Sequence, residues 1–578
     1  MGFYKLKSMN RRFIFSLVVA LAALCSCDNV LGSETGSETG KPDVETDSRV
    51  VNGTKILEGH NLYGLICDTD GHPLGNVPVS DGYRYVLTDE NGVYQTKADT
   101  RATHVFYSLP AGYAIEQDKS SGLPAFYRKI DPSASDIRND FKLKKLSASS
   151  SAFSFAVLGD IHIRDAATAA QFKRGAMARI GQYFKDNAPA GPAFGISLGD
   201  IINNAKDPET FGYAKDALGS ADCGNGQRLP FFTVIGNHDH NARLGNSAQS
   251  GTDGFDLGTG LDFTNTFGPA CYSFNVGAVH FVVLDNYISQ KQPSNSATAL
   301  SGQGQSGLSD DVWKWFMKDL SFVKDKASKM IVVCEHCHIR GFENIPHRED
   351  MLDQMADFHS AYILSGHAHI CETYKYTKVK SKNGNPVVER IHGVPMGNFW
   401  YSMYGPDSSP AGFYVYQVKG NDFSSWKYVC VHDAEDQMRV YDSKDVYDKP
   451  GDWSRQYAWE NESLFADGYY LLAHIYDGNE DWEVTLEQGG TTRSMSFANK
   501  RIYDYCAHSH LANDNIPGIR TNWKYHWDRS ENWWYIKLDR PASELSGWKV
   551  VARSRFPGSG ETKVYTCDKI TRTLTEQL

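Results

Sequence analysis

Short apolar runs that end in a polar cluster recur along the middle of this chain. The run Phe231–Ile235 leads directly into Gly236-Asn237-His238-Asp239, so an Asn, a His and an Asp follow a predicted buried strand. Ligand sites in α/β sheets lie at the carboxyl ends of strands, and all three side chains suit a metal site. Similar runs precede four other clusters: Gly159-Asp160-Ile161-His162, Gly199-Asp200, His336, and Gly366-His367-Ala368-His369.

Between these runs the apolar residues change to helical spacing. Over residues 166–187, for example, Phe172, Ala176 and Ile180 recur on one helical face. Predicted strands, loops and helices alternate in this way over residues 148–432. The alternation predicts an α/β (α+β) domain whose polar clusters share one edge.

Two flanking regions, residues 58–147 and 433–578, are predicted to be β domains. Short runs of β-branched and aromatic residues alternate there with turns that contain Gly, Asn and Pro. The turns of the first region hold Asp68, Asp70, Asp89 and Asn91, and we favour turn hydrogen bonds over a calcium site. In the last region we expect Trp523, Trp527, Trp533 and Trp534 to fill a core rather than to bind carbohydrate.

The first 27 residues have the pattern of a secretory signal. Four basic residues precede the apolar stretch Phe13–Leu24, and Leu24-Cys25-Ser26-Cys27 is similar to a bacterial lipoprotein cleavage box. We therefore expect residues 1–27 to be a lipoprotein signal peptide with Cys27 as the lipidated residue, and ordinary secretion is the alternative. Residues 28–57, with a repeated Ser-Glu-Thr-Gly, are expected to be a flexible tether.

Length and charge narrow the classes of partner. A chain of 578 residues is expected to fold as several domains, and its net charge of −10 does not favour a nucleic-acid polymer as partner. Nine of the eleven cysteines follow Cys27 without regular spacing, so only a Cys506–Cys567 disulfide is considered, and it stays open.

The polar clusters gain their meaning as a set. A single Asp or His at a strand end is most often a helix cap, a turn residue or a surface residue. All five clusters together, in this order and each after a predicted strand, are very improbable by chance. We therefore expect their side chains to form one site.

With these motifs, residues 150–432 resemble the calcineurin-like metallophosphoesterase superfamily. The resemblance implies a four-layer metallophosphoesterase sandwich, flanked by an N-terminal Ig-like or transthyretin-like β-sandwich and a C-terminal β-sandwich. It also implies two divalent metal ions that share one aspartate. The implied ligands are Asp160, His162, Asp200 and His369 for the first ion, and Asp200, Asn237, His336 and His367 for the second.

The same resemblance implies hydrolysis of phosphate mono- or diesters by a hydroxide that bridges the two ions. We therefore expect a small phosphate ester as substrate, with sugar-linked and lipid-linked esters both open. His238 is expected to donate a proton to the leaving group, and Asp239 is expected to hold the ring of His238. Mixed carboxylate and imidazole ligands favour Mn, Zn or Fe over Ca or Mg. We expect Cys334 and Cys337 to take no part in metal binding, and His240, Glu335 and His338 to support the site from outside it.

Two sequence differences from known branches of this superfamily narrow the branch to which the chain is expected to belong. Residues 201–207 contain no Arg, which the phosphoprotein phosphatases carry there, and Asn203 replaces the Tyr of purple acid phosphatases. The aromatic stretch 397–405 either lines the mouth of the site or fills a core, and both readings stay open.

We expect an enzyme of the bacterial cell envelope, periplasmic or on the outer membrane. The alternatives are a catalytically silent surface-binding lipoprotein and a nucleotide-releasing hydrolase of the same superfamily.

Overall fold

The computed structural model describes most of the chain beyond residue 48. The described residues are 49–578 without 148, 206, 242–243, 245–256, 290–303, 342–343, 401, 445–464, 466, 499–501, 503, 505–506, 508–529, 555–561 and 573–578. The expected signal peptide with Cys27, most of the expected tether, Tyr401, Cys506, Trp523 and Trp527 lie outside the described residues. No described helix is both long enough and apolar enough to cross a membrane.

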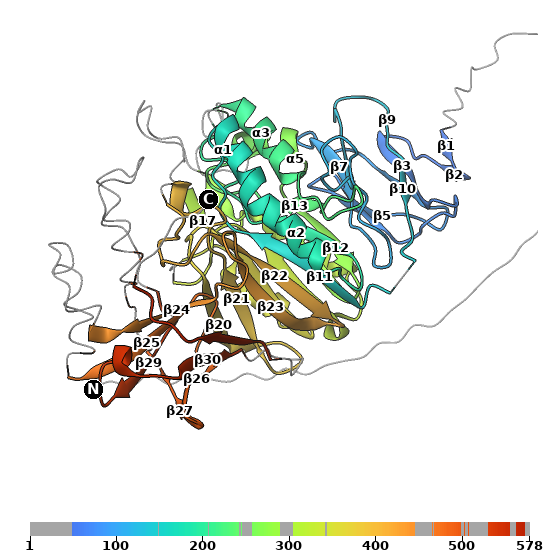
Figure 1. Cartoon of the computed structure of the whole chain (residues 1–578). Helices are drawn as coiled ribbons and strands as arrows, with labels where there is room; N and C mark the ends of the chain where they lie inside the picture. Colours follow the sequence, from blue (N-terminus) through green and yellow to red (C-terminus); the bar gives the residue numbers. More distant parts are fainter. Residues whose placement is uncertain are drawn as a thin grey trace, which may run out of the picture. The chain divides into compact units, whose positions relative to one another are not determined.

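Two sheets form the centre of the structure (Figure 1). The five-stranded sheet has the order β13-β12-β11-β22-β23, in which β11, β12 and β13 are parallel and β22 and β23 are antiparallel to their neighbours. Its strands are β11 Ala152–Leu158, β12 Ala193–Ser197, β13 Phe231–Thr233, β22 Gly412–Lys419 and β23 Asp422–Cys430.

The six-stranded sheet has the order β14-β15-β18-β19-β21-β20, and its four middle strands are parallel. Its strands are β14 Tyr272–Val276, β15 Val279–Val283, β18 Met330–Cys334, β19 Ser360–Ser365, β20 Glu372–Lys380 and β21 Pro386–Ile391. A separate hairpin pairs β16 Tyr287–Ser289 with β17 Gly304–Ser306.

Aromatic side chains join the facing surfaces of the two sheets. Phe155 of the first sheet stacks on Phe194, with ring centroids 5.1 Å apart, and meets Phe281 of the second sheet edge to face at 5.4 Å. Phe232 stacks on Phe274 across the same gap at 3.9 Å. Because these rings are fully or almost fully buried, they hold the two sheets, and the strand ends, in a fixed relation.

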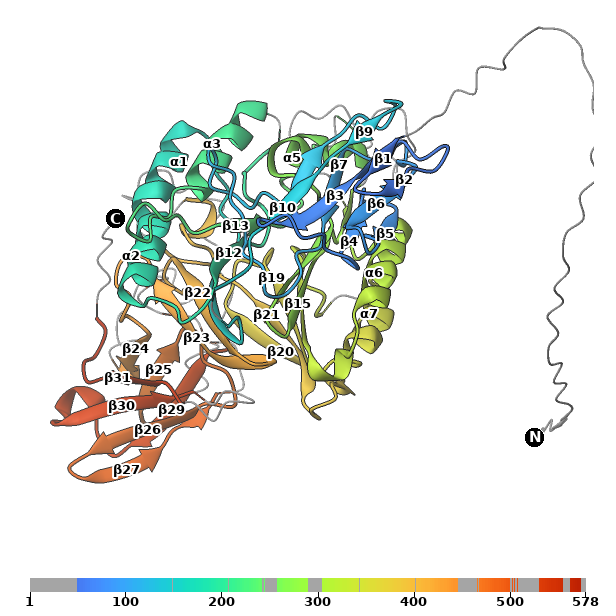
Figure 2. The same ribbon diagram turned by 90° about the vertical axis from the view of Figure 1, so that its right-hand side faces the viewer.

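Helices cover the outer faces. α1, α2, α3 and α5 cover the five-stranded sheet (Figure 1), and α6 and α7 lie beside the six-stranded sheet (Figure 2). Together with the two sheets they form the expected four-layer α/β sandwich, so the predicted fold class is confirmed. The helices are α1 Ala166–Phe172, α2 Ala178–Asp186, α3 Pro208–Leu218, α5 Leu261–Phe267, α6 Asp310–Phe322 and α7 Arg348–Met355.

The predicted helix over 166–187 is present but interrupted. A π-helical turn, Lys173–Met177, separates α1 from α2. Asp165 and Thr168 form a capping box that starts α1: the Asp165 carboxylate accepts the backbone N–H of Thr168, and the Thr168 hydroxyl accepts the backbone N–H of Asp165. Gly175, in the π turn, lies against Met396, whose sulfur is 3.4 Å from the position of a Cβ at Gly175.

The N-terminal β domain contains strands β1 to β10 and contacts α6. Tyr85 donates a hydrogen bond to Asp319, and Trp315 donates one to Ser80. In its turns, Asp68 and Asp89 each accept two backbone N–H bonds, which is the turn chemistry that the sequence favours. The strands are β1 Val50–Val51, β2 Thr54–Lys55, β3 Leu62–Asp68, β4 Pro78–Ser80, β5 Tyr85–Leu87, β6 Val93–Thr96, β7 His104–Tyr107, β8 Tyr127–Lys129, β9 Ile137–Arg138 and β10 Phe141–Leu143.

The C-terminal β domain has two four-stranded sheets, ordered β24-β25-β29-β28 and β27-β26-β30-β31. Trp533 and Trp534 are each 1% exposed, so they lie in its interior as expected. The strands are β24 Met438–Asp442, β25 Tyr469–Ile475, β26 Glu483–Gln488, β27 Thr491–Ser494, β28 Ser496–Phe497, β29 Trp533–Leu538, β30 Trp548–Arg553 and β31 Val564–Cys567.

Candidate metal centre

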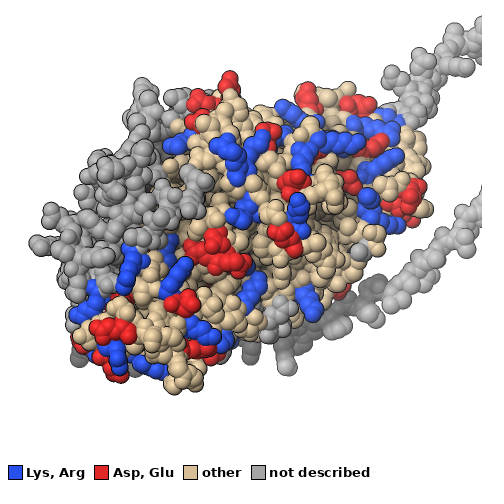
Figure 3. Space-filling model, viewed as in Figure 1, with Lys and Arg blue, Asp and Glu red and all other residues tan. Residues whose placement is uncertain are grey.

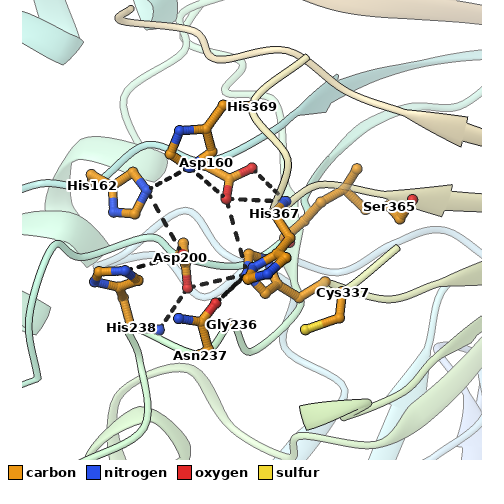
Figure 4. Close-up of polar contacts among 12 residues, drawn as sticks. Asp160, His162, Asp200, Gly236, Asn237, His238, Cys337, Ser365, His367 and His369 are labelled. Carbon is orange, nitrogen blue, oxygen red and sulfur yellow. Dashed lines mark hydrogen bonds and ion pairs between the residues drawn. The ribbon is translucent and has the colours of Figure 1, made fainter. Parts of the chain in front are cut away.

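The polar clusters meet where parallel strands of both sheets end. Asp160 and Asp200 follow β11 and β12, and His336 and His367 follow β18 and β19. Figure 4 shows that side chains from the two sheets point toward one another. The structure therefore brings together all seven predicted ligands: Asp160, His162, Asp200, Asn237, His336, His367 and His369.

Glycine is required where two clusters cross. A Cβ at Gly236 would lie 2.1 Å from the backbone nitrogen of Asp200 and 2.3 Å from its Oδ1. At Gly199 the φ angle is 91°, and a Cβ would lie 2.7 Å from Nδ1 of His336. The glycines of these clusters thus allow the backbones to approach closely enough for their side chains to share one site.

Four of the seven residues adopt left-handed backbone conformations. The φ angles are 55° for His162, 46° for Asp200, 66° for His367 and 61° for His369. Each such non-glycine residue costs about 1–3 kcal/mol unless its surroundings fix it. Strain of this kind, concentrated in one cluster of polar side chains, is typical of a functional site.

One group of ligands surrounds Asp160. Nε2 of His369 lies 3.3 Å from Oδ1 of Asp160, and Nε2 of His162 lies 3.0 Å from Nε2 of His369. Oδ2 of Asp200 is 3.7 Å from Nε2 of His162. These four side chains each offer one ligand atom within 4.8 Å of the others, and all four are buried.

A second group lies on the other side of Asp200. Oδ1 of Asp200 is 3.3 Å from Nε2 of His336, which lies 3.2 Å from Nδ1 of His367. Oδ1 of Asn237 is within 3.0 Å of both imidazole nitrogens. Asp200 thus directs one carboxylate oxygen toward each group, which is the arrangement of a shared ligand.

Hydrogen bonds outside the cluster orient the rings. Nδ1 of His336 bonds the carbonyl of Leu198 at 2.8 Å, and Nδ1 of His369 bonds Oδ1 of Asn398 at 2.7 Å. In a neutral imidazole these bonds place the proton on Nδ1 and leave Nε2 as a lone-pair donor that faces the cluster. The rings are thus prepared to bind a cation.

The electrostatics also favour cations. Burial raises the pKa of Asp160, but the neighbouring His369 and His336 outweigh it and lower that pKa to about 2. Burial, followed by the charge of His336, lowers the pKa of His367 to about 4, whereas the carboxylates of Asp200 and Asp160 outweigh burial and raise the pKa of His336 to about 10. Asp160 and Asp200 thus stay ionised and hold a proton on His336, so the cluster attracts positive charge.

The donor set fits divalent metal ions. In the described structure Nε2 of His162 faces Nε2 of His369 at 3.0 Å, and Nε2 of His336 faces Nδ1 of His367 at 3.2 Å. Two imidazole lone pairs at such distances repel each other unless a proton or a cation lies between them. Carboxylate, amide and imidazole donors around such points suit a divalent metal ion.

The role expected of Asp239 is wrong. Its carboxylate is fully buried and accepts backbone N–H bonds from Gly236, Ile201 and Ile202. The ring of His238 is held instead by the carbonyl of Asn203, 2.7 Å from Nδ1. The short turn carries the Asp239 carboxylate back under the strand ends, so it fixes the two loops and not the ring.

Three features of the site were not predicted from the sequence. The carbonyl of Asn203 is a backbone group, so no residue type announces it. Asn398 belongs to the stretch 397–405 whose role the sequence leaves open, and it now bonds His369. Cys337, expected to stay apart, has its sulfur within 4.8 Å of ligand atoms of His336 and His367.

The fold and this cluster define a two-sheet α/β protein with a candidate metal site, and comparison with known families gives the same class. Residues 153–371 match the family model described as calcineurin-like phosphoesterase. Residues 61–146 match its N-terminal model and residues 371–545 its C-terminal model. The chain belongs to the calcineurin-like phosphoesterase superfamily.

Two solved structures show low similarity. A purple acid phosphatase from yellow lupin (Lupinus luteus) seeds is 13% identical, with 61% of this chain and 57% of that chain covered and a TM-score of 0.34. A 5'-nucleotidase precursor from Thermus thermophilus is 14% identical, with 48% and 54% covered and a TM-score of 0.25. The match spans little more than half of each of those chains. A comparison with curated proteins gives no match.

Proposed function

We propose that this protein hydrolyses small phosphate esters at a dinuclear metal centre. The observation that carries the proposal is the position of Asp200, with Oδ2 3.7 Å from His162 and Oδ1 3.3 Å from His336. When bound, two divalent cations supply an activated water and neutralise the charge that grows on the phosphoryl oxygens. The first set of ligands is Asp160, His162, Asp200 and His369, and the second is Asp200, Asn237, His336 and His367.

In this proposal His238 donates the proton that the departing alcohol oxygen needs. Its Nδ1 bonds the carbonyl of Asn203, so Nε2 faces Asp200 at 3.9 Å. The side chain is 22% exposed, whereas that of His336 is fully buried. His238 thus reaches from the cluster toward solvent, where a leaving group departs.

The site and the charge pattern of the surface support a small substrate. Acidic and basic side chains are interspersed over the face shown in Figure 3, without a basic stripe for a nucleic-acid polymer. Monoesters and diesters are both included in the proposal, because the described site contains no residue that separates them.

We also propose that the enzyme is held on the bacterial cell envelope by a lipid on Cys27. The proposal rests on the basic, apolar and small-residue order of residues 1–27. A Cys27→Ala variant is expected to leave the membrane fraction and appear in the soluble fraction. Retention of that variant in the membrane fraction would contradict a lipid anchor at this position.

The central test combines metal analysis with turnover. Purified protein is expected to contain about two divalent ions per chain, and a chelator is expected to abolish hydrolysis of chromogenic mono- and diesters until metal is returned. His238→Ala is expected to lower kcat about 10²–10⁴-fold and to keep both ions. His72→Ala is the control, because the side chain of His72 is 72% exposed on the N-terminal domain.

Two outcomes would contradict the proposal. Tight binding of phosphate esters without turnover would identify a catalytically silent binding protein. A single ion per chain, or His238→Ala with full activity, would contradict the dinuclear centre or the assigned proton donor respectively.

A further inference from the structure

An aromatic turn stands beside the first group of ligands. The turn Asn398–Trp400 follows the six-stranded sheet, and all three of its residues lie close to the site. The ring centroid of Phe399 is 4.4 Å from that of His162, 4.7 Å from that of His369 and 6.0 Å from that of His238. Phe399 is half-buried, so part of its surface is accessible to solvent.

The conformation of this turn is unfavourable and firmly held. Phe399 and Trp400 have φ angles of 48° and 64°, which side chains with a Cβ rarely adopt. The indole N–H of Trp400 donates to the carbonyls of Ile161 and His162, both at 2.9 Å. Asn398 bonds His369 on the other side. Such strain persists only where surrounding bonds fix it, and it often marks a functional position.

The C-terminal domain supports the loop that follows the turn. Arg439 donates a hydrogen bond to the carbonyl of Ser408 at 2.9 Å, and its guanidinium lies 5.0 Å from the ring centre of Tyr404. The backbone carbonyl of Tyr404 in turn accepts a hydrogen bond from the backbone N–H of Asn398. The ring of Phe399 is therefore connected to a rigid frame rather than to a free loop.

The inference rests on the proposed function, in which the alcohol departs on the His238 side of the cluster. We propose that Phe399 is a specificity-determining residue that packs against this alcohol and favours phosphate esters of flat, aromatic-ring alcohols over esters of open-chain alcohols. An apolar ring near both His162 and His238 offers a flat alcohol a stacking or edge-to-face contact. It offers no hydrogen bond to a small hydrophilic alcohol.

The test compares esters that share the phosphate and differ only in the alcohol. Phenyl phosphate and butyl phosphate are hydrolysed side by side, with diphenyl and dibutyl phosphate as the diester pair. Phe399→Ala is expected to lower the phenyl-to-butyl ratio of kcat/KM by about three- to tenfold, the fold-change that corresponds to an aromatic contact. Because the comparison is between variant and parent, the different intrinsic reactivities of the esters cancel.

Three controls separate selection from structural damage. Phe399→Tyr keeps the ring and is expected to keep the ratio. Tyr374→Ala removes a 41% exposed aromatic residue from the outer strand β20 and is expected to change nothing. Phenylphosphonate, which cannot be hydrolysed, is expected to bind Phe399→Ala three- to tenfold more weakly than the parent, with butylphosphonate binding and metal content unchanged.

The outcomes distinguish this inference from the function on which it rests. Equal losses for phenyl and butyl esters in Phe399→Ala, in protein that still turns over, would overturn the inference alone. Absence of turnover with all four esters in metal-loaded parent protein would overturn the proposed function and the inference together.

Discussion

Asp239 shows how much a single residue's neighbours decide its role. A carboxylate directly after a His suggests a partner for the ring, yet its two oxygens accept three backbone N–H groups from the loops after β12 and β13. Burial, followed by the charge of Asp200, raises its pKa to about 7. Burial of the ionised carboxylate is therefore unfavourable, and the three backbone hydrogen bonds that it accepts beneath the proposed ligands partly offset this cost.

Asp239→Asn is expected to destabilise the protein by about 1–3 kcal/mol, because an amide has only one oxygen and leaves a buried N–H without a partner. Denaturant unfolding measures this change. We expect metal content to fall with stability, since the same loops carry Asp200 and Asn237. Unchanged stability and metal content, together with a shifted pH profile of kcat, would instead support the ring-holding role that the structure contradicts.

His104 of the N-terminal domain provides a pH-dependent stability term. Burial and the nearby charge of Lys129 lower its pKa from 6.5 to about 4. Between these pH values the unfolded chain binds a proton that the folded chain does not. Stability is therefore complete above pH 6.5 and decreases as the pH falls toward 4, by on the order of 3 kcal/mol.

Denaturant unfolding at several pH values tests this prediction. His104→Gln is expected to remove that part of the slope, because glutamine does not titrate. A slope that is the same in the parent and the variant would show that His104 contributes nothing in this range.

At the scale of single residues, the sequence predicts which residues form the cluster better than it predicts which groups hydrogen-bond to them. The seven ligand candidates were recognisable because each follows an apolar run, and the structure brings them into one cluster. The partners of His369 and His238 were not recognisable. Asn398 comes after the last motif in an aromatic stretch, and the bond from Asn203 uses its backbone, which every residue has.

At the scale of elements, the turns after parallel strands determine the site. β11, β12 and β13 end side by side, so their turns lie next to one another even though they are far apart in sequence. The closeness of these turns depends on glycine at the points where they cross. This packing, and not the ligand side chains alone, sets the spacing of the two groups.

Gly236→Ala is expected to displace Asp200 from both groups, because the new methyl carbon would lie 2.1–2.3 Å from atoms of Asp200. We expect loss of most bound metal and of hydrolysis. Gly212→Ala, in helix α3, is the matched control: nothing lies within 4 Å of its Cβ position, and alanine stabilises a helix by about 1 kcal/mol relative to glycine. Full metal content in Gly236→Ala would contradict the crossing geometry.

Helix continuity was the weakest expectation for an element. The spacing of Phe172, Ala176 and Ile180 predicts one helix, and it does not reveal the π turn at Lys173–Met177. The extra residue of a π turn changes the helical face without changing the residue types.

At the scale of the whole molecule, the C-terminal domain is joined to the site by buried polar contacts. Arg439 pairs with Asp504 at 2.9 Å, and both side chains are at most 4% exposed. Asn532 donates a hydrogen bond to the carbonyl of Cys371, two residues after His369. The boundary between the two matched family models at residue 371 therefore does not separate the C-terminal part of the chain from the site. β22 and β23, which follow this boundary, also complete the five-stranded sheet.

Arg439→Met is expected to destabilise the protein by about 3–5 kcal/mol, because it leaves the carboxylate of Asp504 buried without its cation. Denaturant unfolding measures the loss, and adding Asp504→Asn is expected to restore part of it. Lys382→Met, which breaks the exposed pair with Asp357, is the control and is expected to cost at most about 1 kcal/mol. Equal costs for the two single variants would contradict a structural role for the buried pair.

The long separation between β11 and its antiparallel neighbour affects how the chain matures. β11 pairs with β22 from Ala152↔Lys419 onward, so the strand before Asp160 has an open edge until residue 419 has been synthesised. A nascent polypeptide on the ribosome has therefore made every ligand, the last at His369, while that edge is still bare. All the proposed ligands are thus made before the sheet can close, and a chain truncated near residue 400 would keep that strand edge exposed, which makes it a target for chaperones and proteases instead of a smaller enzyme.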